Sequence, residues 1–118
     1  MRNITKALLD ANQLAAILEH VPAGITVIDE EGQILYYNQY CAQFVERKPE
    51  YLGRDIRLCH LQPKSIEKIE RMLSDLKEGK ATEYYYEALR NGNRLGVRIT
   101  PYDIGGKRGL IQCFSVLE

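Results

Sequence analysis

The chain has 118 residues, which predicts one domain with a core large enough to be stable without disulfides or a structural metal. Its 16 Lys and Arg residues balance 16 Asp and Glu residues, so no basic excess indicates a nucleic-acid surface and no charge run indicates a solvated tail. No apolar run reaches the roughly 18 residues of a membrane span, and the first residues lack the apolar core of a signal peptide. We therefore expect a cytoplasmic protein.

The first predicted element is a helix over residues 4–20. Leu14, Ile17 and Leu18 fall at the spacing of one helical face, which could cover the domain's own sheet. A second apolar stripe has two explanations: a small domain that wraps its helix deeply, or a dimer interface, because a helix that is apolar on two sides requires a second surface. The residues expected at that interface are Ile4, Leu8, Leu9, Ala11 and Ala15.

The segment from Gly24 to Asn38 predicts a β-hairpin. Its β-branched residues favour a half-buried strand, and an acidic turn that ends at Gly32 separates them from a second apolar run. Asn38 is a predicted N-cap for a short helix over residues 39–45, because its side chain can accept from the free amides of the first turn. Residues 46–62 sustain no period, so we expect short helical turns and loop there, and a stretch of this kind is often functional.

Residues 63–78 predict the long helix of the domain. Pro63 suits a first helical turn, and Gly79 suits a C-terminal stop. The rest of the chain predicts strands, separated by turns at Asn91-Gly92 and Gly105-Gly106. The fold expected is α+β, a five-stranded antiparallel sheet with the short helices and the long helix on one face, plus the N-terminal helix. The buried stripe expected on the long helix comprises Ile66, Ile69, Leu73 and Leu76.

The order of these elements, together with several short sequence motifs, resembles the PAS domain family. The motifs are Val21-Pro22-Ala23-Gly24-Ile25, Gly32-Gln33-Ile34, Tyr37-Asn38, Gly53-Arg54-Asp55 and Gly109-Leu110-Ile111. The resemblance spans residues 13–117 and is strongest with PAS domains of bacterial and archaeal sensory proteins. It implies a PAS domain over residues 21–118, with residues 1–20 as a flanking dimerisation helix.

The resemblance also implies a function. PAS domains sense signals, either by binding a small ligand between the sheet and the short helices or by dimerising, and they regulate an attached output domain. Such an output domain would be a histidine kinase of a two-component system, a cyclic-dinucleotide enzyme or a transcription regulator. The chain closes at Glu118 without one, so we interpret it as an excised sensor module, with a protein that acts without an output domain as the alternative.

A small-ligand pocket is expected between sheet and helices, with a solidly packed core as the alternative. Either Tyr85 faces inward while Tyr84 and Tyr86 face a partner, or the reverse; we place Tyr85 inside. The residues expected to line the pocket are Val27, Phe44, Leu52, Ile56, Leu58, His60, Ile69, Tyr85, Val97 and Gln112.

Two cofactors are weaker hypotheses. His60 lies near the position of an axial histidine in haem-binding PAS domains, and imidazole is a normal haem ligand. The segment 53–62 superficially resembles the flavin site of LOV domains, but Ile56 occupies the place of the reactive cysteine.

Catalysis is not expected, because the chain has no phosphate loop, no metal-ligand spacing and no nucleophile elbow. The three cysteines, Cys41, Cys59 and Cys113, are far apart and form no C-x-x-C, so we expect neither a disulfide framework nor a zinc site. A thiol redox switch at Cys59 is a separate hypothesis that depends on its exposure.

Overall fold

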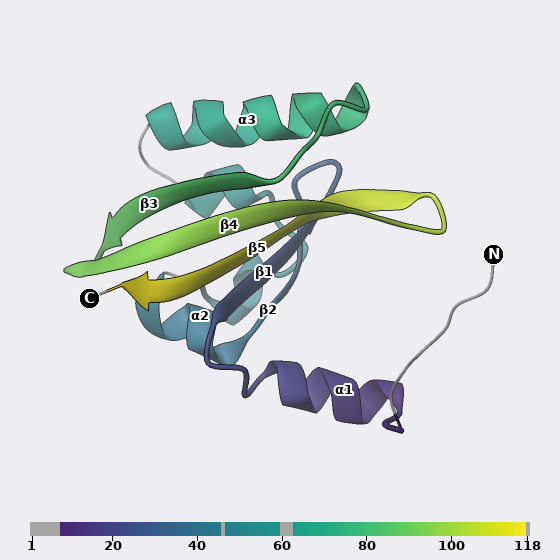
Figure 1. The fold of residues 1–118 in the computed structure, drawn as a ribbon, viewed down its shortest axis with the longest axis vertical. Coiled ribbons are helices and arrows are strands. Elements are labelled where there is room, and N and C mark those ends of the chain that lie inside the picture. The colour runs from purple at the N-terminus through teal and green to yellow at the C-terminus, as the bar shows by residue number, and fades with distance from the viewer. Residues whose placement is uncertain (1–7, 46, 60–62, 118) are drawn as a thin grey trace.

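The structure, a computed structural model, describes residues 8–45, 47–59 and 63–117 (Figure 1). The described part of the chain confirms the expected α+β architecture. Its helices are α1 (Ala11–Leu18), α2 (Gln39–Phe44) and α3 (Pro63–Lys77), with 3₁₀ turns η1 (Pro49–Tyr51) and η2 (Ile56–Cys59). Its strands are β1 (Gly24–Asp29), β2 (Ile34–Tyr37), β3 (Tyr84–Arg90), β4 (Asn93–Ile104) and β5 (Lys107–Leu117).

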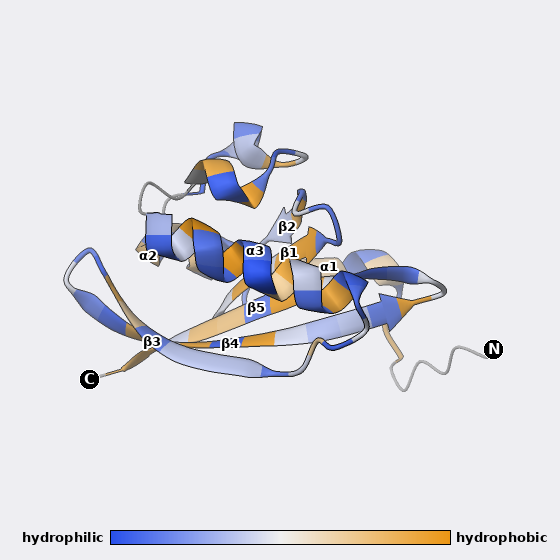
Figure 2. Ribbon diagram, turned by 90° about the horizontal axis from the view of Figure 1, so that it is seen from above, coloured by the Kyte–Doolittle hydropathy of each residue, from blue (hydrophilic) through white to orange (hydrophobic). Residues whose placement is uncertain are grey.

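The five strands form one antiparallel sheet in the order β2-β1-β5-β4-β3. The first strand therefore pairs with the last one in the middle of the sheet, and Gly24 lies opposite Phe114. The sheet is strongly curved, and α3 lies against one of its faces (Figure 2). In Figure 1, α3 runs along the β3 side of the sheet and α1 lies beyond β2 on the other side.

The hydrophobic core fills the space between that face of the sheet, which we call the inner face, and the helices. Strand register fixes which residues point inward: Val97 lies opposite both Tyr86 and Phe114. The helices contribute buried residues of their own. Of the stripe expected on α3, Leu73 and Leu76 are buried together with Met72, whereas Ile66 and Ile69 are half-buried. The buried core residues are Ile28, Ile34, Cys41, Ile56, Met72, Leu73, Leu76, Leu95, Val97, Ile99, Leu110 and Phe114.

Two buried glycines allow aromatic rings to lie flat against the sheet. On the inner face, a Cβ on Gly24 would lie 1.9 Å from Cε2 of Phe114, so only glycine accommodates the ring in this position. On the opposite, outer face, the side chain of Tyr102 crosses Gly109 and donates a hydrogen bond to the Ile28 carbonyl oxygen at 3.1 Å. These contacts join β1, β4 and β5 through side chains as well as through the ladder.

Helix α1 differs from the expected helix over residues 4–20. It begins after Asp10, whose side chain accepts from the Gln13 amide while the Gln13 side chain accepts from the Asp10 amide, a reciprocal capping box. None of its residues is buried. Leu14, Ile17 and Leu18 are 37, 48 and 40% exposed, so the expectation that this stripe covers the sheet is wrong.

The other expected elements are present with small changes at their ends. Asn38 is the N-cap of α2, Gly79 ends α3 with a positive φ of 72°, and Asn91 and Gly92 both adopt positive φ in the β3–β4 turn. Strand β4 is longer than alternation alone indicated, because it extends past Pro101 to Ile104. None of the described helices has the length and apolar character needed to span a membrane.

Candidate functional site

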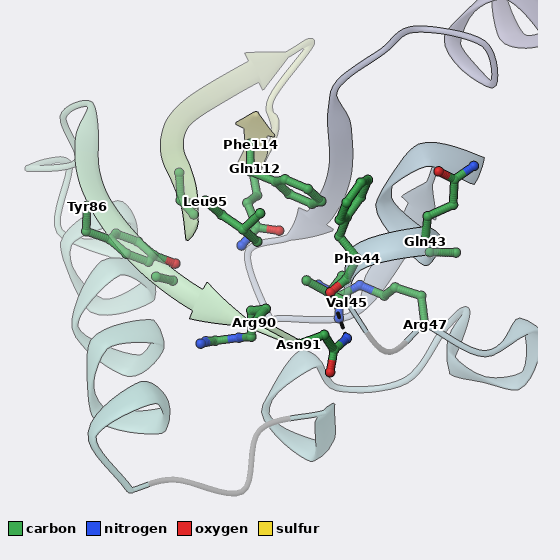
Figure 3. A pocket seen from close by; sticks show the side chains of 13 residues that line it. Gln43, Phe44, Val45, Arg47, Tyr86, Arg90, Asn91, Leu95, Gln112 and Phe114 are labelled. Carbon is green, nitrogen blue, oxygen red and sulfur yellow. Dashed lines mark hydrogen bonds between the residues drawn. The ribbon is translucent and has the colours of Figure 1, made fainter. Parts of the chain in front are cut away.

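The inner face of the sheet encloses a cavity of about 400 Å³ beside α2 (Figure 3). Its walls come from the end of α2 and the residues after it, from β3 with its turn, and from the inner positions of β4 and β5. The residues that line it are Ala42, Gln43, Phe44, Val45, Arg47, Tyr86, Ala88, Arg90, Asn91, Leu95, Val97, Gln112 and Phe114.

A second cavity of about 200 Å³ adjoins the first on the side of α3. The two cavities share four lining residues, Tyr86, Ala88, Arg90 and Gln112. Together they have the size of a pocket for a small organic molecule. The second cavity adds Ile28, Ile56, Ser65, Lys68, Ile69, Met72, Glu87 and Leu110 to the walls.

One wall of the larger cavity is aromatic and apolar. The ring of Phe44 lies 5.0 Å from that of Tyr40 and meets the ring of Phe114 nearly edge-on, with centroids 6.2 Å apart. Leu95 and Val97 continue this surface along β4. Because such a wall is rigid and non-polar, it suits the apolar body of a ligand.

Around Tyr86, which lines both cavities, the site is polar and carries positive charge. Nζ of Lys68 lies 3.8 Å from the ring centroid of Tyr86, a cation–π contact. Burial raises the pKa of the Tyr86 hydroxyl, and a hydrogen bond from Gln112 and the charges of Arg90 and Arg47 partly offset that rise. Tyr86 is therefore protonated at neutral pH, with the Lys68 ammonium group on its ring.

At the rim of the cavity, Asn91 forms a hydrogen bond with a residue that is distant in the sequence. Its Nδ2 donates to the Phe44 carbonyl oxygen at 3.2 Å, the hydrogen bond drawn in Figure 3. Asn91 adopts φ of 50° in the tight turn between β3 and β4, a conformation that asparagine tolerates better than most residues. This contact holds the end of α2 over the cavity.

The other end of α2 is held by Asn38, which is completely buried. Its Oδ1 accepts from the amides of Cys41 and Ile25, both at 3.0 Å. Its Nδ2 donates to the carbonyl oxygens of Leu18 at 3.0 Å and Ala23 at 2.8 Å. One side chain therefore joins the end of α1, the start of β1 and the helix that walls the cavity.

The residues expected to line the pocket divide into three groups. Phe44, Ile56, Ile69, Val97 and Gln112 do line one or both cavities.

Four other expected residues lie elsewhere, which corrects their placement. Val27 and Tyr85 lie on the outer face of the sheet, because Val27 pairs with Ile111 and Tyr85 with Arg98. Leu52 and Leu58 lie in the segment around η1 and η2, where they are 51 and 69% exposed. His60 lies outside the described residues.

The polar lining residues Tyr86, Arg47, Arg90 and Lys68 were missed from sequence. A usable signal existed for Tyr86: the two-residue turn at Asn91-Gly92 sets Arg90 opposite Asn93, which places Tyr86 opposite the apolar Val97. The reverse alternative for the three tyrosines is therefore the correct one. Arg47 and Lys68 had no such signal, because they lie in a loop and on the exposed side of a helix.

Among the described residues, no group of three His, Cys, Asp or Glu side chains is placed to hold a metal ion. Cys41 is buried, with its sulfur 3.2 Å from the Thr26 hydroxyl, and burial raises the pKa of its thiol. Ile56, at the place of the flavin-reactive cysteine of LOV domains, is a buried apolar residue of the cavity wall.

Several solved structures share the fold of this chain. A C-terminal domain from Streptococcus mutans is 23% identical, with a TM-score of 0.79 over 99% of this chain and 92% of that one. A sensory box sensor histidine kinase from Vibrio cholerae is 14% identical, with a TM-score of 0.62 over 89 and 90%. The PAS domain of the quorum-sensing receptor RpfR from Cronobacter turicensis, in complex with BDSF, is 14% identical, with a TM-score of 0.62 over 83 and 96%.

No curated protein sequence matches the chain. The family model described as PAS domain matches residues 14–112. That range contains every strand from β1 to β4, Asn38 and every residue that lines the two cavities except Phe114. The chain therefore belongs to the PAS domain family.

Proposed function

We propose that this protein is a sensory module that binds a small ligand in the cavity of the inner face and regulates an attached output domain. The observation that carries the proposal is the connection through Asn38, which bonds the end of α1 and caps the helix that walls the cavity. A ligand that changes the position of α2 would change these hydrogen bonds. It can shift the equilibrium between the two positions of α2 only by the difference between its affinities for them.

The structural neighbours also support a sensory role. One structural neighbour is a sensor histidine kinase and another is a receptor PAS domain in complex with a small molecule. By analogy, the output domain would be a histidine kinase of a two-component system, with a cyclic-dinucleotide enzyme or a transcription regulator as other candidates, in a cytoplasmic signalling protein. We assign residues 1–20 to the flanking segment and residues 21–118 to the sensor.

Dimerisation through the N-terminal segment is the second part of the proposal. Helix α1 is exposed along its whole length although most of its residues are apolar, and water-exposed apolar surface of this kind favours association. A second copy of α1 is a suitable partner, since the two apolar stripes of the N-terminal helix carry no charged residue. The proposed interface contains Leu8, Leu9, Ala11 and Ala15, and Ile4 outside the described residues.

Native mass spectrometry with an absorption spectrum tests the ligand, on protein purified without added cofactor. We expect an organic adduct in the wild type and in T100F, whose substitution lies on the exposed outer face. We expect none in A88F, because Ala88 lines both cavities and Phe at position 88 would obstruct the space where they adjoin. Bound flavin or a haem spectrum would instead make His60 the first residue to substitute. Wild-type protein without any adduct would favour the alternative, a protein-interaction module whose core is solidly packed.

Sedimentation velocity tests the dimer. We expect the wild type to sediment as a dimer and A15E as a monomer, because a charge in the centre of an apolar interface is costly. N12E is the matched control, since Asn12 is an exposed polar residue of the same helix. An A15E protein that dimerises like the wild type would show that α1 is not the interface.

A further inference from the structure

Strand β3 forms one edge of the sheet, and β4 is its one neighbour among the described strands (Figure 1). The two-residue turn between β3 and β4 makes Arg90 and Asn93 a hydrogen-bonded pair, and such pairs alternate along an antiparallel ladder. The amides and carbonyls of Tyr85, Glu87 and Leu89 therefore point away from β4. The Leu89 carbonyl oxygen accepts from Nη1 of the neighbouring Arg90 at 2.9 Å and keeps a second lone pair for a strand partner.

The opposite edge of the sheet is protected against pairing with another strand. Strand β2 has only four residues, and its register against β1 is shifted within the strand. The Ile34 amide donates to the Arg54 carbonyl oxygen at 2.8 Å, and the Ile34 carbonyl oxygen accepts from the Gly53 amide at 2.7 Å. Proteins shorten, distort or cover their edges in this way, because an open edge recruits other strands. Strand β3 lacks these devices: it has seven residues in regular register and contains no proline or lysine.

The residues of β3 with free backbone groups also form a small surface on the outer face of the sheet. Tyr85 and Leu89 are 53 and 68% exposed, and Glu87 lies between them in the strand. Glu87 Oε1 pairs with Nη1 of Arg94 at 3.7 Å, but the two side chains are 49 and 54% exposed, so the carboxylate can accept from a second cation. In an added strand, the residues opposite these three would present their side chains to the same face.

A second copy of β3 matches this surface poorly. Antiparallel pairing that sets Tyr85 of each copy against Leu89 of the other also sets Glu87 against Glu87, and like charges directly opposite each other destabilise a sheet. A shift of two residues separates the carboxylates but aligns only two of the three positions. A basic residue opposite Glu87 is favourable instead, because opposite charges in a cross-strand pair stabilise the sheet.

We propose that β3 is a docking site for an extended segment of another protein, added antiparallel to the edge of the sheet. The segment carries a basic residue opposite Glu87 and apolar residues opposite Tyr85 and Leu89. The backbone hydrogen bonds supply affinity, and the three side chains determine which segment binds and in which register. This inference adds an interaction surface to the proposed function and does not depend on the cavities.

Two peptides test the inference by fluorescence anisotropy: fluorescein-TVTKTVT-amide and fluorescein-TVTETVT-amide, which differ only in the charge of the central residue. We expect the wild type to bind the lysine peptide about fivefold more tightly, the difference made by one cross-strand charge pair. Methylation of the valine and lysine nitrogens, which would face β3, should abolish binding. Methylation of three threonine nitrogens, which would face away from β3, should leave it intact.

Substitution of Glu87 tests the charge contact from the side of the protein. E87Q should lose most of the preference for the lysine peptide, and E87K should prefer the glutamate peptide. E50K is the matched control, because Glu50 is an exposed residue of η1, close to the segment that covers β2. It makes the same charge change away from β3 and should keep the preference of the wild type.

Several outcomes would overturn the proposal. Equal affinity of the wild type for both peptides, or an unchanged preference in E87K, would show that Glu87 does not select the segment. Binding that survives methylation of the valine and lysine nitrogens would show that the peptide does not extend the sheet. If neither peptide binds, the proposal is wrong. Loss of a dimer in L89P, which removes an amide that points away from β4, would then identify a second copy of β3 as the occupant.

Discussion

Nδ2 of Asn38 lies 3.0 Å from the carbonyl oxygen of Leu18, so a buried side chain between β2 and α2 closes the last turn of a helix twenty residues earlier in the chain. The same side chain makes three more hydrogen bonds, to Ala23, Ile25 and Cys41. Since each partner belongs to a different segment, Asn38 determines how α1 meets the domain.

The variant N38A is expected to lose about 3 kcal/mol of unfolding free energy, because it removes an N-cap and leaves buried backbone groups without partners. Urea denaturation measures this loss. Q39A is the control: Gln39 is exposed next to Asn38, and its substitution should change stability by less than about 0.5 kcal/mol. Equal stability of the two variants would show that water replaces the Asn38 contacts at no cost.

Gly24 and Phe114 should be energetically coupled. Alanine at position 24 would place Cβ within 1.9 Å of the Phe114 ring, so G24A must displace a fully buried side chain and should cost about 1–3 kcal/mol. The smaller F114L side chain leaves room for that methyl group. In a double-mutant cycle, G24A should cost less in the F114L background than in the wild type; strictly additive costs would contradict the packing described.

Asp55 should make the protein sensitive to acid. Its Oδ1 and Oδ2 accept from the Arg57 guanidinium at 2.8 and 2.7 Å, and these bonds lower the pKa of the carboxyl group. The resulting stability is present above the unfolded-state pKa of about 3.9 and is lost as pH falls through the lower folded-state pKa. The D55N variant should therefore lose less stability than wild type over that acid range.

The size of this effect is modest, because the side chains of Arg57 and Asp55 are 31 and 36% exposed. Solvent screening limits it to less than about 1 kcal/mol. Thermal unfolding between neutral pH and pH 2 measures it, with E67Q, on the exposed side of α3, as the control. A D55N curve parallel to that of wild type would show that the Arg57 contact does not stabilise the folded state.

Two cysteines should differ sharply in reactivity. Cys113 is exposed on the outer face, whereas Cys41 is buried and burial raises the pKa of its thiol. In a C59S background, Ellman's reagent should modify Cys113 rapidly and Cys41 at least about a thousandfold more slowly, because modification of Cys41 requires unfolding. The double variant C59S/C113S should lack the rapid phase, and a rapid phase that persists there would show that α2 opens locally.

Local sequence signals predicted the elements of this fold well. The cap at Asn38, the proline and glycine that bound α3, and the Asn91-Gly92 turn each have a physical meaning that one or two residues carry. The order of these elements along the chain, with several short motifs, then indicated the PAS domain family. Neither the local signals nor the family resemblance depends on which side chains face each other across the sheet.

The candidate site depends on which side chains face each other across the sheet, and it was predicted less well. Val27 and Tyr85 have strand-forming side chains that suit either face, so their placement required the register. Leu52 and Leu58 lie in a segment without periodicity, where apolar character does not indicate burial. The cationic residues Arg47 and Lys68 resemble ordinary surface residues until the positions of α2, α3 and Tyr86 are known.

The pairing of β1 with β5 has a consequence for how the chain acquires its structure. Gly24 and Phe114 are opposite each other although almost the whole domain separates them in sequence, and contacts of such long range slow folding. Until β5 is in place, β1 and β4 are both unpaired edges that can recruit strands from other molecules. A copy shortened before β5 should therefore aggregate during synthesis rather than persist as a smaller folded domain.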